Sequence, residues 1–357
     1  MRALVLAGGT GSRMRPLSHT RPKQLVPVAG RPVLEHVVRG VRELGITDIG
    51  VITGDGGDHV RNELGDGSRV GAALTYIHQS RPRGLADCVR AARGFLGQDP
   101  FVLCLGDNLL PSGFTGLAEE FRSRASDAHI AVQRVADPSE FGVVDMGADG
   151  KVGRLVEKPA VPVSDWAIIG VYFFSPAIHE AVQAIEPSSR GELEITDAIQ
   201  WLLEHGYGVS AGAYKGYWAD VGRPDDVLRA NRHLLDTLDP SVAEGTVTPD
   251  SLLEGPVFLG EGARVVRSTV VGPVVVGPAT VVTDSFVGPA TSIGAHCSLN
   301  GADVADSVLM DGVRIDGPVP LRGSVVGRES VIRSTGTGAR SGHRIVVGDH
   351  TRIETGF

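Results

Sequence analysis

Cysteine is scarce in this chain of 357 residues, and the three that occur stand far apart. Cys88, Cys104 and Cys297 form no C-x-x-C pair, so neither a zinc site nor a disulfide framework is indicated. No apolar run reaches the ~18 residues that a membrane-spanning helix needs, and the first residues do not resemble a signal peptide. We therefore expect a protein of the reducing cytoplasm with no membrane partner.

Positive charge is also lacking, because the net charge is −8. A nucleic-acid partner needs a basic face, so the composition argues against one, and any anionic substrate must be held by local cations. Lysine is rare: Lys23, Lys151, Lys158 and Lys215 are the four in the chain. Arginine and lysine are not interchangeable, so a chain that avoids lysine is expected to keep it where a compact ammonium group matters.

The first thirty residues carry a glycine-rich turn. A short apolar strand, 3–7, runs into Gly8, Gly9, Thr10, Gly11 and Ser12. Backbone N–H groups at such a turn converge and bind phosphate. Arg13 and Lys23 would add two cations, about the charge that a triphosphate requires. The turn is neither a Rossmann fingerprint, because Met14 takes the place of the third glycine, nor a Walker A loop.

The rest of the chain divides by pattern into two predicted domains. Residues 1–238 alternate strand patterns, such as 101–105 and 168–174, with helix patterns, such as 85–95. This alternation predicts an α/β domain with a Rossmann-like, mostly parallel sheet covered on both faces. Residues 251–357 are rich in Gly, Val and Pro, and aliphatic residues followed by glycine recur, as in Val287-Gly288 and Ile293-Gly294. A six-residue repeat of this kind predicts a parallel β-helix; a Gly/Val-rich sandwich is the alternative. Beyond about residue 316 the repeat is hard to follow.

Two sequence segments together resemble a known family signature. The run L-A-G-G-T-G-S-R-M-R-P-L, followed by R-P-K-Q-L-V-P-V, is similar to the signature of sugar-1-phosphate nucleotidylyltransferases. The P-K-Q-L form resembles glucose-1-phosphate thymidylyltransferases, and the likeness extends over the whole chain. It matches the long type, which carries a C-terminal left-handed β-helix.

The resemblance implies transfer of a thymidylyl group from dTTP to glucose 1-phosphate, with pyrophosphate leaving. The sugar phosphate is already an anion, so the protein needs no general base and must instead position two anions and offset their charge. Asp107 follows a buried strand at the sheet edge where ligands bind, and Asp220 resembles the second metal ligand of the family. Mg²⁺ is the implied cofactor. The residues expected to carry the reaction are Arg13, Lys23, Asp107, Lys158 and Asp220.

The resemblance also implies two sets of binding residues. The nucleotide set is Leu6, Gly8, Gly9, Thr10, Gly11, Ser12, Gln24, Gln79 and Gly84, in which Gln79 and the Gly84 N–H would read the pyrimidine edge. The sugar-phosphate set is Asn108, Gly142, Glu157, Lys158, Val171 and Glu194, in which Lys158 would hold the phosphate. Asp87 and Cys88 depart from the residues usual after G-L-A.

Alternatives remain for these residues and for the function. Asp107 and Asp220 could serve only as turn or capping residues, Glu157 and Lys158 as an exposed pair, and Glu194 as the start of a helix. The same fold could use UTP or another sugar 1-phosphate. A further alternative is that the protein is not an enzyme but a regulatory subunit, which binds nucleotide without catalysis. We further expect the β-helix to support a homo-oligomer.

Overall fold

The computed structural model describes residues 1–9, 11–147, 151–238, 244–334 and 342–355. Its contacts divide the chain into two compact units. The first unit comprises Met1–Gly9 and Leu34–Asp220, and the second comprises Thr10–Val33 and Val221–Phe357. The sequence-based boundaries, 1–238 and 251–357, stay a prediction, and Thr10 lies outside the described residues.

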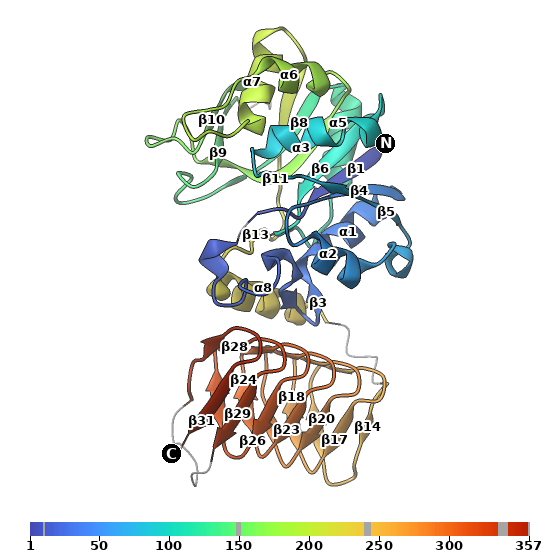
Figure 1. Ribbon diagram of the computed structural model, residues 1–357, viewed down its shortest axis with the longest axis vertical. Coiled ribbons are helices and arrows are strands. Elements are labelled where there is room, and N and C mark those ends of the chain that lie inside the picture. The colour runs from blue at the N-terminus through green and yellow to red at the C-terminus, as the bar shows by residue number, and fades with distance from the viewer. Residues whose placement is uncertain (10, 148–150, 239–243, 335–341, 356–357) are drawn as a thin grey trace. The chain divides into compact units, whose positions relative to one another are not determined.

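A nine-stranded mixed sheet forms the centre of the first unit (Figure 1). Its main path runs β10-β9-β11-β6-β1-β4-β5, while β8 pairs with β11 and with β12. The strands are β1 Arg2–Leu6, β4 Asp48–Thr53, β5 Ala73–His78, β6 Phe101–Leu105, β8 Ala128–Arg134, β9 Gly142–Met146, β10 Val152–Glu157, β11 Trp166–Phe174 and β12 Val209–Ala213. The predicted parallel α/β sheet is confirmed from β6 to β5 and between β8 and β12, whereas β11 is antiparallel to its three neighbours.

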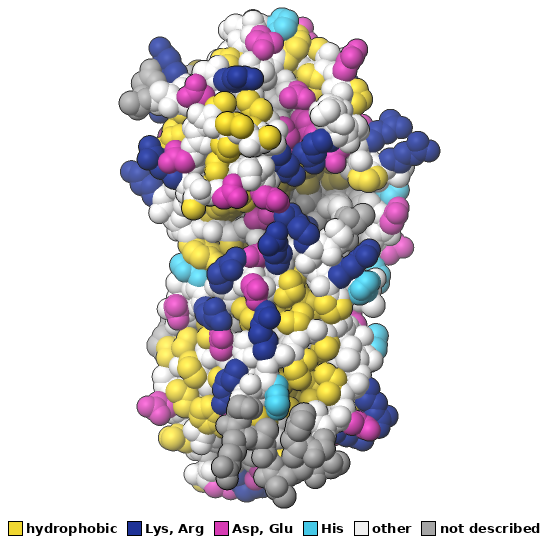
Figure 2. Space-filling model, turned by 90° about the vertical axis from the view of Figure 1, so that its left-hand side faces the viewer, with side chains coloured by type: hydrophobic (Ala, Val, Ile, Leu, Met, Phe, Trp, Pro, Cys, Tyr) yellow, Lys and Arg dark blue, Asp and Glu magenta, His cyan; other side chains and the backbone are white. Residues whose placement is uncertain are grey.

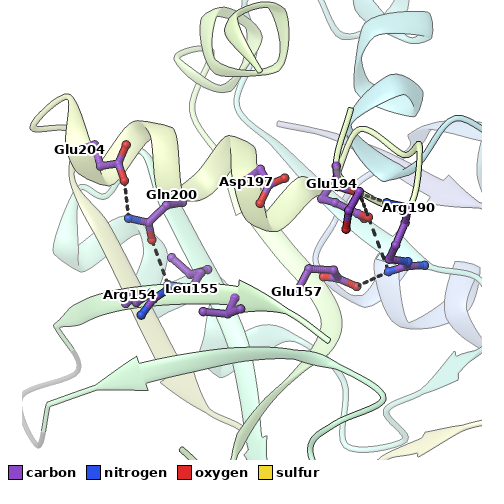
Figure 3. Close-up of a pocket in the computed structure, with 11 residues that line it drawn as sticks. Arg154, Leu155, Glu157, Arg190, Glu194, Asp197, Gln200 and Glu204 are labelled. Carbon is purple, nitrogen blue, oxygen red and sulfur yellow. Dashed lines mark hydrogen bonds and ion pairs between the residues drawn. The ribbon is translucent and has the colours of Figure 1, made fainter. Parts of the chain in front are cut away.

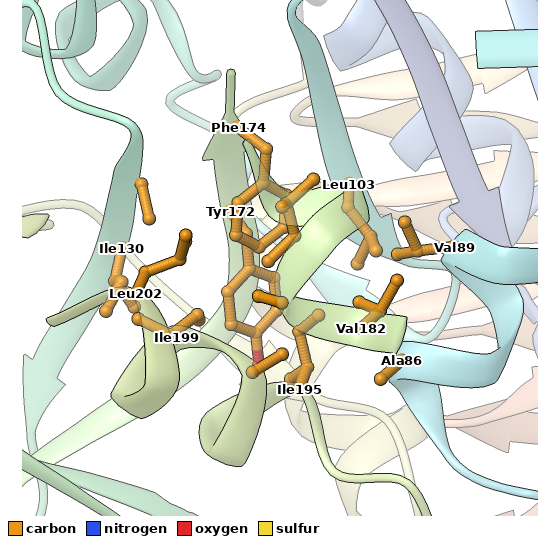
Figure 4. Close-up of a cluster of buried hydrophobic side chains, with 14 of the residues drawn as sticks. Ala86, Val89, Leu103, Ile130, Tyr172, Phe174, Val182, Ile195, Ile199 and Leu202 are labelled. Carbon is orange, nitrogen blue, oxygen red and sulfur yellow. The ribbon is translucent and has the colours of Figure 1, made fainter. Parts of the chain in front are cut away.

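Helices cover both faces of this sheet. They are α1 Val33–Glu43, α2 Gly57–Leu64, α3 Leu85–Ala91, α4 Arg93–Leu96, α5 Thr115–Arg124, α6 Ile178–Ala184 and α7 Ile195–Glu204, with a 3-10 turn at Ser68–Val70. Successive side chains of β11 point to opposite faces. Tyr172 and Phe174 therefore stack with each other in the core beneath α3, α6 and α7 (Figure 4), and Phe173 instead stacks on Phe121 of α5.

Buried aliphatic side chains explain why β6 and β11 were predicted well, since both strands are apolar on each face. The segment predicted as one helix over residues 85–95 forms two helices, α3 and α4, which Ala92 separates. Gly94, a poor helix former, lies within the short helix α4. The hairpin of β9 and β10 and the helix α2 were not predicted.

The second unit contains residues 11–33, which we call the glycine-rich loop, a helix and a parallel β-helix. The loop carries 3-10 turns at Ser12–Met14 and Lys23–Leu25 and the short strands β2 Pro27–Val28 and β3 Arg31–Pro32. Helix α8 spans Pro224–Asp236. Asn231 of α8 is fully buried; it accepts from the Ala29 N–H of the loop and from the Ser292 hydroxyl, and it donates to the Ala290 carbonyl. This one amide therefore joins loop, helix and β-helix.

Three parallel sheets form the β-helix, which confirms that prediction (Figure 1). One sheet contains β14 Thr246–Val247, β17 Arg264–Val266, β20 Val281–Thr283, β23 Ser298–Asn300, β26 Arg314–Asp316, β29 Val331–Ser334 and β31 Arg352–Thr355. The next contains β15 Leu252–Glu254, β18 Thr269–Val271, β21 Phe286–Val287, β24 Asp303–Ala305 and β27 Pro320–Arg322. The third contains β16 Val257–Leu259, β19 Val274–Val276, β22 Thr291–Ile293, β25 Val308–Leu309, β28 Val325–Val326 and β30 Val346–Val347.

A ladder of buried aliphatic side chains runs through the β-helix core. The parallel register places Val265, Val282, Leu299, Ile315 and Ile332 on successive coils, each at most 1% exposed. The coils therefore continue past residue 316, where the sequence repeat was hard to follow. Other hydrophobic side chains reach the surface of the β-helix (Figure 2).

Candidate active site

Two aspartates meet at the carboxyl end of β6. Asp107 lies two residues after this strand, and β7, Asn108–Leu109, pairs antiparallel with β13, Ala219–Asp220. The register places Asp220 opposite Asn108, the residue that follows Asp107, so the two predicted metal ligands belong to neighbouring segments. The Asn108 side-chain N–H donates to Asp107 Oδ1 at 3.0 Å and so orients that carboxylate.

Trp218 fixes this strand pair to the next part of the site. Its indole N–H donates to Asn108 Oδ1 at 2.7 Å, and its ring packs edge-on against Phe141 with the centroids 5.3 Å apart. Phe141 precedes β9, and its carbonyl accepts from the Lys158 N–H at 3.0 Å. A chain of contacts therefore connects the aspartates to the loop that carries Lys158.

The predicted sugar-binding carboxylates lie close together and share one arginine (Figure 3). Arg190 Nη1 is 3.4 Å from Glu157 Oε1 and 3.5 Å from Glu194 Oε1. Thr196 and Ser188 hydroxyls donate to Glu157 and Glu194, at 3.1 and 2.9 Å. Burial raises the pKa of Glu157, and the neighbouring Glu194 raises it further.

A cavity of about 350 Å³ opens beside these carboxylates. Besides Glu157, Arg190 and Glu194, it is lined by residues of β10 and α7, among them Asp197 and Gln200 (Figure 3). Gly142 lies opposite Glu157 in the β9–β10 register, and Lys158 is exposed just after β10. The structure therefore brings four of the sugar-set residues together, Gly142, Glu157, Lys158 and Glu194.

The predicted base-reading residues also lie together. Gln79 Nε2 donates to Asp87 Oδ2 at 2.9 Å, and Gln79 Oε1 would lie 3.9 Å from a Cβ built on Gly8. Gly84 begins α3 with a φ of 99°, and a Cβ there would be 2.4 Å from the Leu193 carbonyl oxygen. Only glycine fits this turn, so the Gly84 backbone is fixed against the segment that carries Glu194.

The cationic turns of the glycine-rich loop belong to the second unit. Arg13 lies on the 3-10 turn that follows Gly11, and Lys23 begins the next 3-10 turn. A Cβ on Gly11 would lie 3.2 Å from the Lys23 Cβ, so the two turns contact each other. The loop thus gathers Gly11, Ser12, Arg13, Lys23 and Gln24, of which the Gln24 side chain is buried.

Two residues of the predicted binding sets have side chains that are buried in the sheet. Leu6 and Val171 are buried in the sheet, at 6% and 1% exposed, and the Leu6 carbonyl accepts from the Gly106 N–H. Sequence reasoning missed Asp87, Arg190 and Trp218. Trp218 stands close to a predicted ligand, two residues before Asp220. Arg190 lies in a turn that precedes α7, so the helical spacing rule gives no signal for its pairing with Glu194.

The chain matches the model of the family described as nucleotidyl transferase over residues 2–237. It is 46% identical to a glucose-1-phosphate thymidylyltransferase of Streptomyces antibioticus, with 99% of each chain covered. It is 44% identical to the low-salt glycan biosynthesis nucleotidyltransferase Agl11 of Haloferax volcanii, with 99% of this chain and 100% of that protein covered. A crystal structure of a Bacillus anthracis protein, named as a candidate glucose-1-phosphate thymidylyltransferase in complex with sucrose, shares 35% identity. It superposes with a TM-score of 0.61 over 65% of this chain and 94% of that one.

The chain therefore belongs to the nucleotidyl transferase family, and its fold agrees with that class. It is a nucleotidyltransferase with a C-terminal parallel β-helix. Among the residues described, no helix is both long and apolar enough to cross a bilayer.

Proposed function

We propose that this enzyme transfers a thymidylyl group from dTTP to glucose 1-phosphate, giving dTDP-glucose and pyrophosphate. The full-length relatives of Streptomyces antibioticus and Streptomyces griseus, 46% and 47% identical and both named glucose-1-phosphate thymidylyltransferase, support this choice of substrates. The sugar phosphate attacks the α-phosphorus of the nucleotide in line, and the bond from that phosphorus to pyrophosphate breaks.

The observation that carries the proposal is the pairing of β7 with β13. It places Asp220 opposite Asn108 and beside Asp107, at the sheet edge where ligands bind in α/β folds. Mg²⁺ suits two carboxylates, because it keeps several waters and completes its shell with substrate phosphates. When bound, Mg²⁺ would neutralise charge on the transferring phosphate.

The other residues then have distinct tasks. Glu157 and Glu194 accept hydrogen bonds from sugar hydroxyls, and Arg190 holds the two carboxylates in place. Lys158 attracts the sugar's phosphate, while Arg13 and Lys23 offset the charge of the triphosphate. The attacking oxygen is already deprotonated at neutral pH, so the site needs cations and donors rather than a base.

A second candidate keeps the reaction and changes the substrates. This candidate uses another nucleotide or another sugar 1-phosphate. It is supported by the 44% identity to Agl11, which is nearly as high as the identity to the thymidylyltransferases. Pyrophosphate release should be measured for dTTP, UTP, dCTP and ATP with glucose 1-phosphate and other sugar 1-phosphates, each with and without chelator. Fastest release from dTTP and glucose 1-phosphate, abolished by chelator, is expected. Full activity in excess chelator would remove the metal from the proposal, and nucleotide binding without turnover would favour a regulatory subunit.

A further inference from the structure

The last described coil of the β-helix packs closely against the glycine-rich loop, within the second unit. A Cβ built on Gly348 would lie 2.9 Å from the Pro16 carbonyl oxygen. Real side chains are not accommodated at such a distance from backbone, so the coil and the loop meet main chain to main chain. Gly348 and Pro16 are separated by more than three hundred residues, so the contact joins distant parts of the sequence within the second unit.

Asp349 secures this contact. Its side chain is only 3% exposed, and its Oδ2 accepts from the Thr20 hydroxyl at 2.5 Å and lies 3.5 Å from Arg21 Nε. Its Oδ1 accepts from the Arg328 N–H of the preceding coil at 2.8 Å. A buried carboxylate is costly unless its oxygens are paired, and here both are. Asp349 is therefore held by the preceding coil and in turn holds Thr20 and Arg21.

Thr20 and Arg21 lie between the two cationic turns of the loop. Lys23 follows two residues after Arg21, and the Ser18 hydroxyl donates to the Gly11 carbonyl at 2.6 Å, which closes the turn that carries Arg13. A shift of Thr20 and Arg21 would therefore move Ser18 on one side and Lys23 on the other. The Asp349 contact restrains the middle of the segment whose ends bear the proposed triphosphate cations.

We propose that Asp349 is a positioning residue of the nucleotide phosphate site. It does not touch the nucleotide; by holding Thr20 and Arg21 it fixes Lys23 and the turn with Arg13, so that the β-helix contributes to triphosphate binding. The idea rests on the proposed function of the loop, but not on which base the nucleotide carries. A loop that already holds its cations in place binds a triphosphate without the entropy loss of becoming ordered. Displacement of a positioning group by about 1 Å can lower the rate by up to about 100-fold.

The test compares Asp349→Asn with a matched control, Asp306→Asn. Asp306 also lies on the β-helix and pairs with an arginine, Arg232 of α8, but it does not contact residues 16–23 of the loop in any described bond. Loss of the charge opposite Arg21 should raise KM for the nucleotide about 10-fold, while KM for the sugar 1-phosphate stays within about twofold. Asp306→Asn should leave both constants unchanged. Thr20→Val, which removes one bond to Asp349, should change the same constant in the same direction by less.

Calorimetric titration of each variant with dTTP alone separates binding from turnover. Weaker dTTP binding in Asp349→Asn with an unchanged melting temperature supports positioning. Equal rises in both KM values, or losses that follow the melting temperature in Asp349→Asn and Asp306→Asn alike, would show that Asp349 is only structural. If the wild-type enzyme prefers another nucleotide, that nucleotide replaces dTTP, so failure of the substrate assignment and failure of this proposal give different results.

Discussion

The side-chain amide of Gln79 is oriented by Asp87, whose carboxylate accepts from Gln79 Nε2 at 2.9 Å. A carboxylate accepts hydrogen bonds, so turning the amide would set Gln79 Oε1 against Asp87 and lose this bond. If Gln79 reads the base as proposed, thymine uses the Gln79 oxygen for its N3–H, whereas cytosine, which has an acceptor at N3, needs the turned amide. We therefore expect the pair to favour thymine or uracil over cytosine.

Asp87→Asn should relax this selectivity, because the amide introduced at this position can donate as well as accept. A hydrogen bond to a charged group contributes about 1.5–3 kcal/mol, so the ratio of kcat/KM for dTTP to that for dCTP should fall about 10-fold or more. Asp99→Asn, which alters a surface aspartate paired with Arg2, is the control. An unchanged ratio in Asp87→Asn would show that this carboxylate does not govern base choice.

Asp107→Asn should lower kcat by about 10²–10³, because loss of one preorganised electrostatic contact at the reacting group costs about 3–4 kcal/mol. The substitution is nearly isosteric, and circular dichroism should show an intact fold. Asp165→Asn, at an exposed aspartate paired with Arg134, should keep full activity. A rate for Asp107→Asn within a few-fold of the wild type would assign Asp107 a structural role only.

Lys158→Ala should weaken the use of glucose 1-phosphate far more than the use of dTTP. Lys158 follows Glu157, which lies beside the cavity, and its proposed partner is the sugar's phosphate. We expect KM for glucose 1-phosphate to rise about 10-fold or more, as for loss of a charge-assisted hydrogen bond. Lys215→Ala, at another exposed lysine, controls for lost surface charge. Equal losses for the two substrates would contradict the assignment.

His129 should make the protein less stable in mild acid. It is fully buried against Ser210, and burial, helped by Arg124, lowers its pKa from 6.5 to about 4. Between these values the unfolded chain binds a proton that the folded chain does not, so the free energy of unfolding falls as pH drops from 6.5 to 4, by about 3 kcal/mol. His129→Gln should flatten the decline of Tm over this range, and His205→Gln should not. Parallel Tm curves for His129→Gln and the wild type would contradict this origin of the acid sensitivity.

The expected homo-oligomer can be tested on one face of the β-helix. Leu252 and Phe286 are both partly exposed, at 55% and 37%, and the register places them above and below Thr269 on successive coils. Hydrophobic side chains at the β-helix surface are visible in Figure 2. Replacing both residues by serine should lower the mass measured by light scattering if this face joins subunits. The pair Arg264→Ser and Arg314→Ser, on another sheet, is the control, and an unchanged mass in the first variant would exclude this face.

The features that were predicted best from the sequence are those that a local residue pattern determines. The apolar run 101–105 is β6 to the residue, and Asp107 stands at its carboxyl end as expected. The β-helix was predicted from its aliphatic repeat, although the repeat faded where the coil length changes: Ile315 pairs with Ile332, but Ile332 pairs with Ile353 across a longer coil.

The parts that sequence could not predict are contacts between distant residues. Trp218 and Asn108 are 110 positions apart, and Thr20 and Asp349 are 329 apart. Neither pair has a local signature, because each depends on how separate elements pack. The hairpin of β9 and β10 escaped prediction for a related reason, since its short strands are only partly buried and their pairing, not their composition, makes them strands.

The coils of the β-helix also limit how the length of this part of the chain can change. The Ser268 and Ser285 hydroxyls each accept from a backbone N–H 17 residues further along the chain, at Ser285 and Ala302. Duplication or loss of one such coil would leave every inward aliphatic residue inward and every hydroxyl opposite its N–H. An insertion of one residue within a strand would instead turn the side chains that follow it to the opposite face. Evolution can therefore lengthen or shorten this stack by whole turns, while smaller additions are confined to the corners.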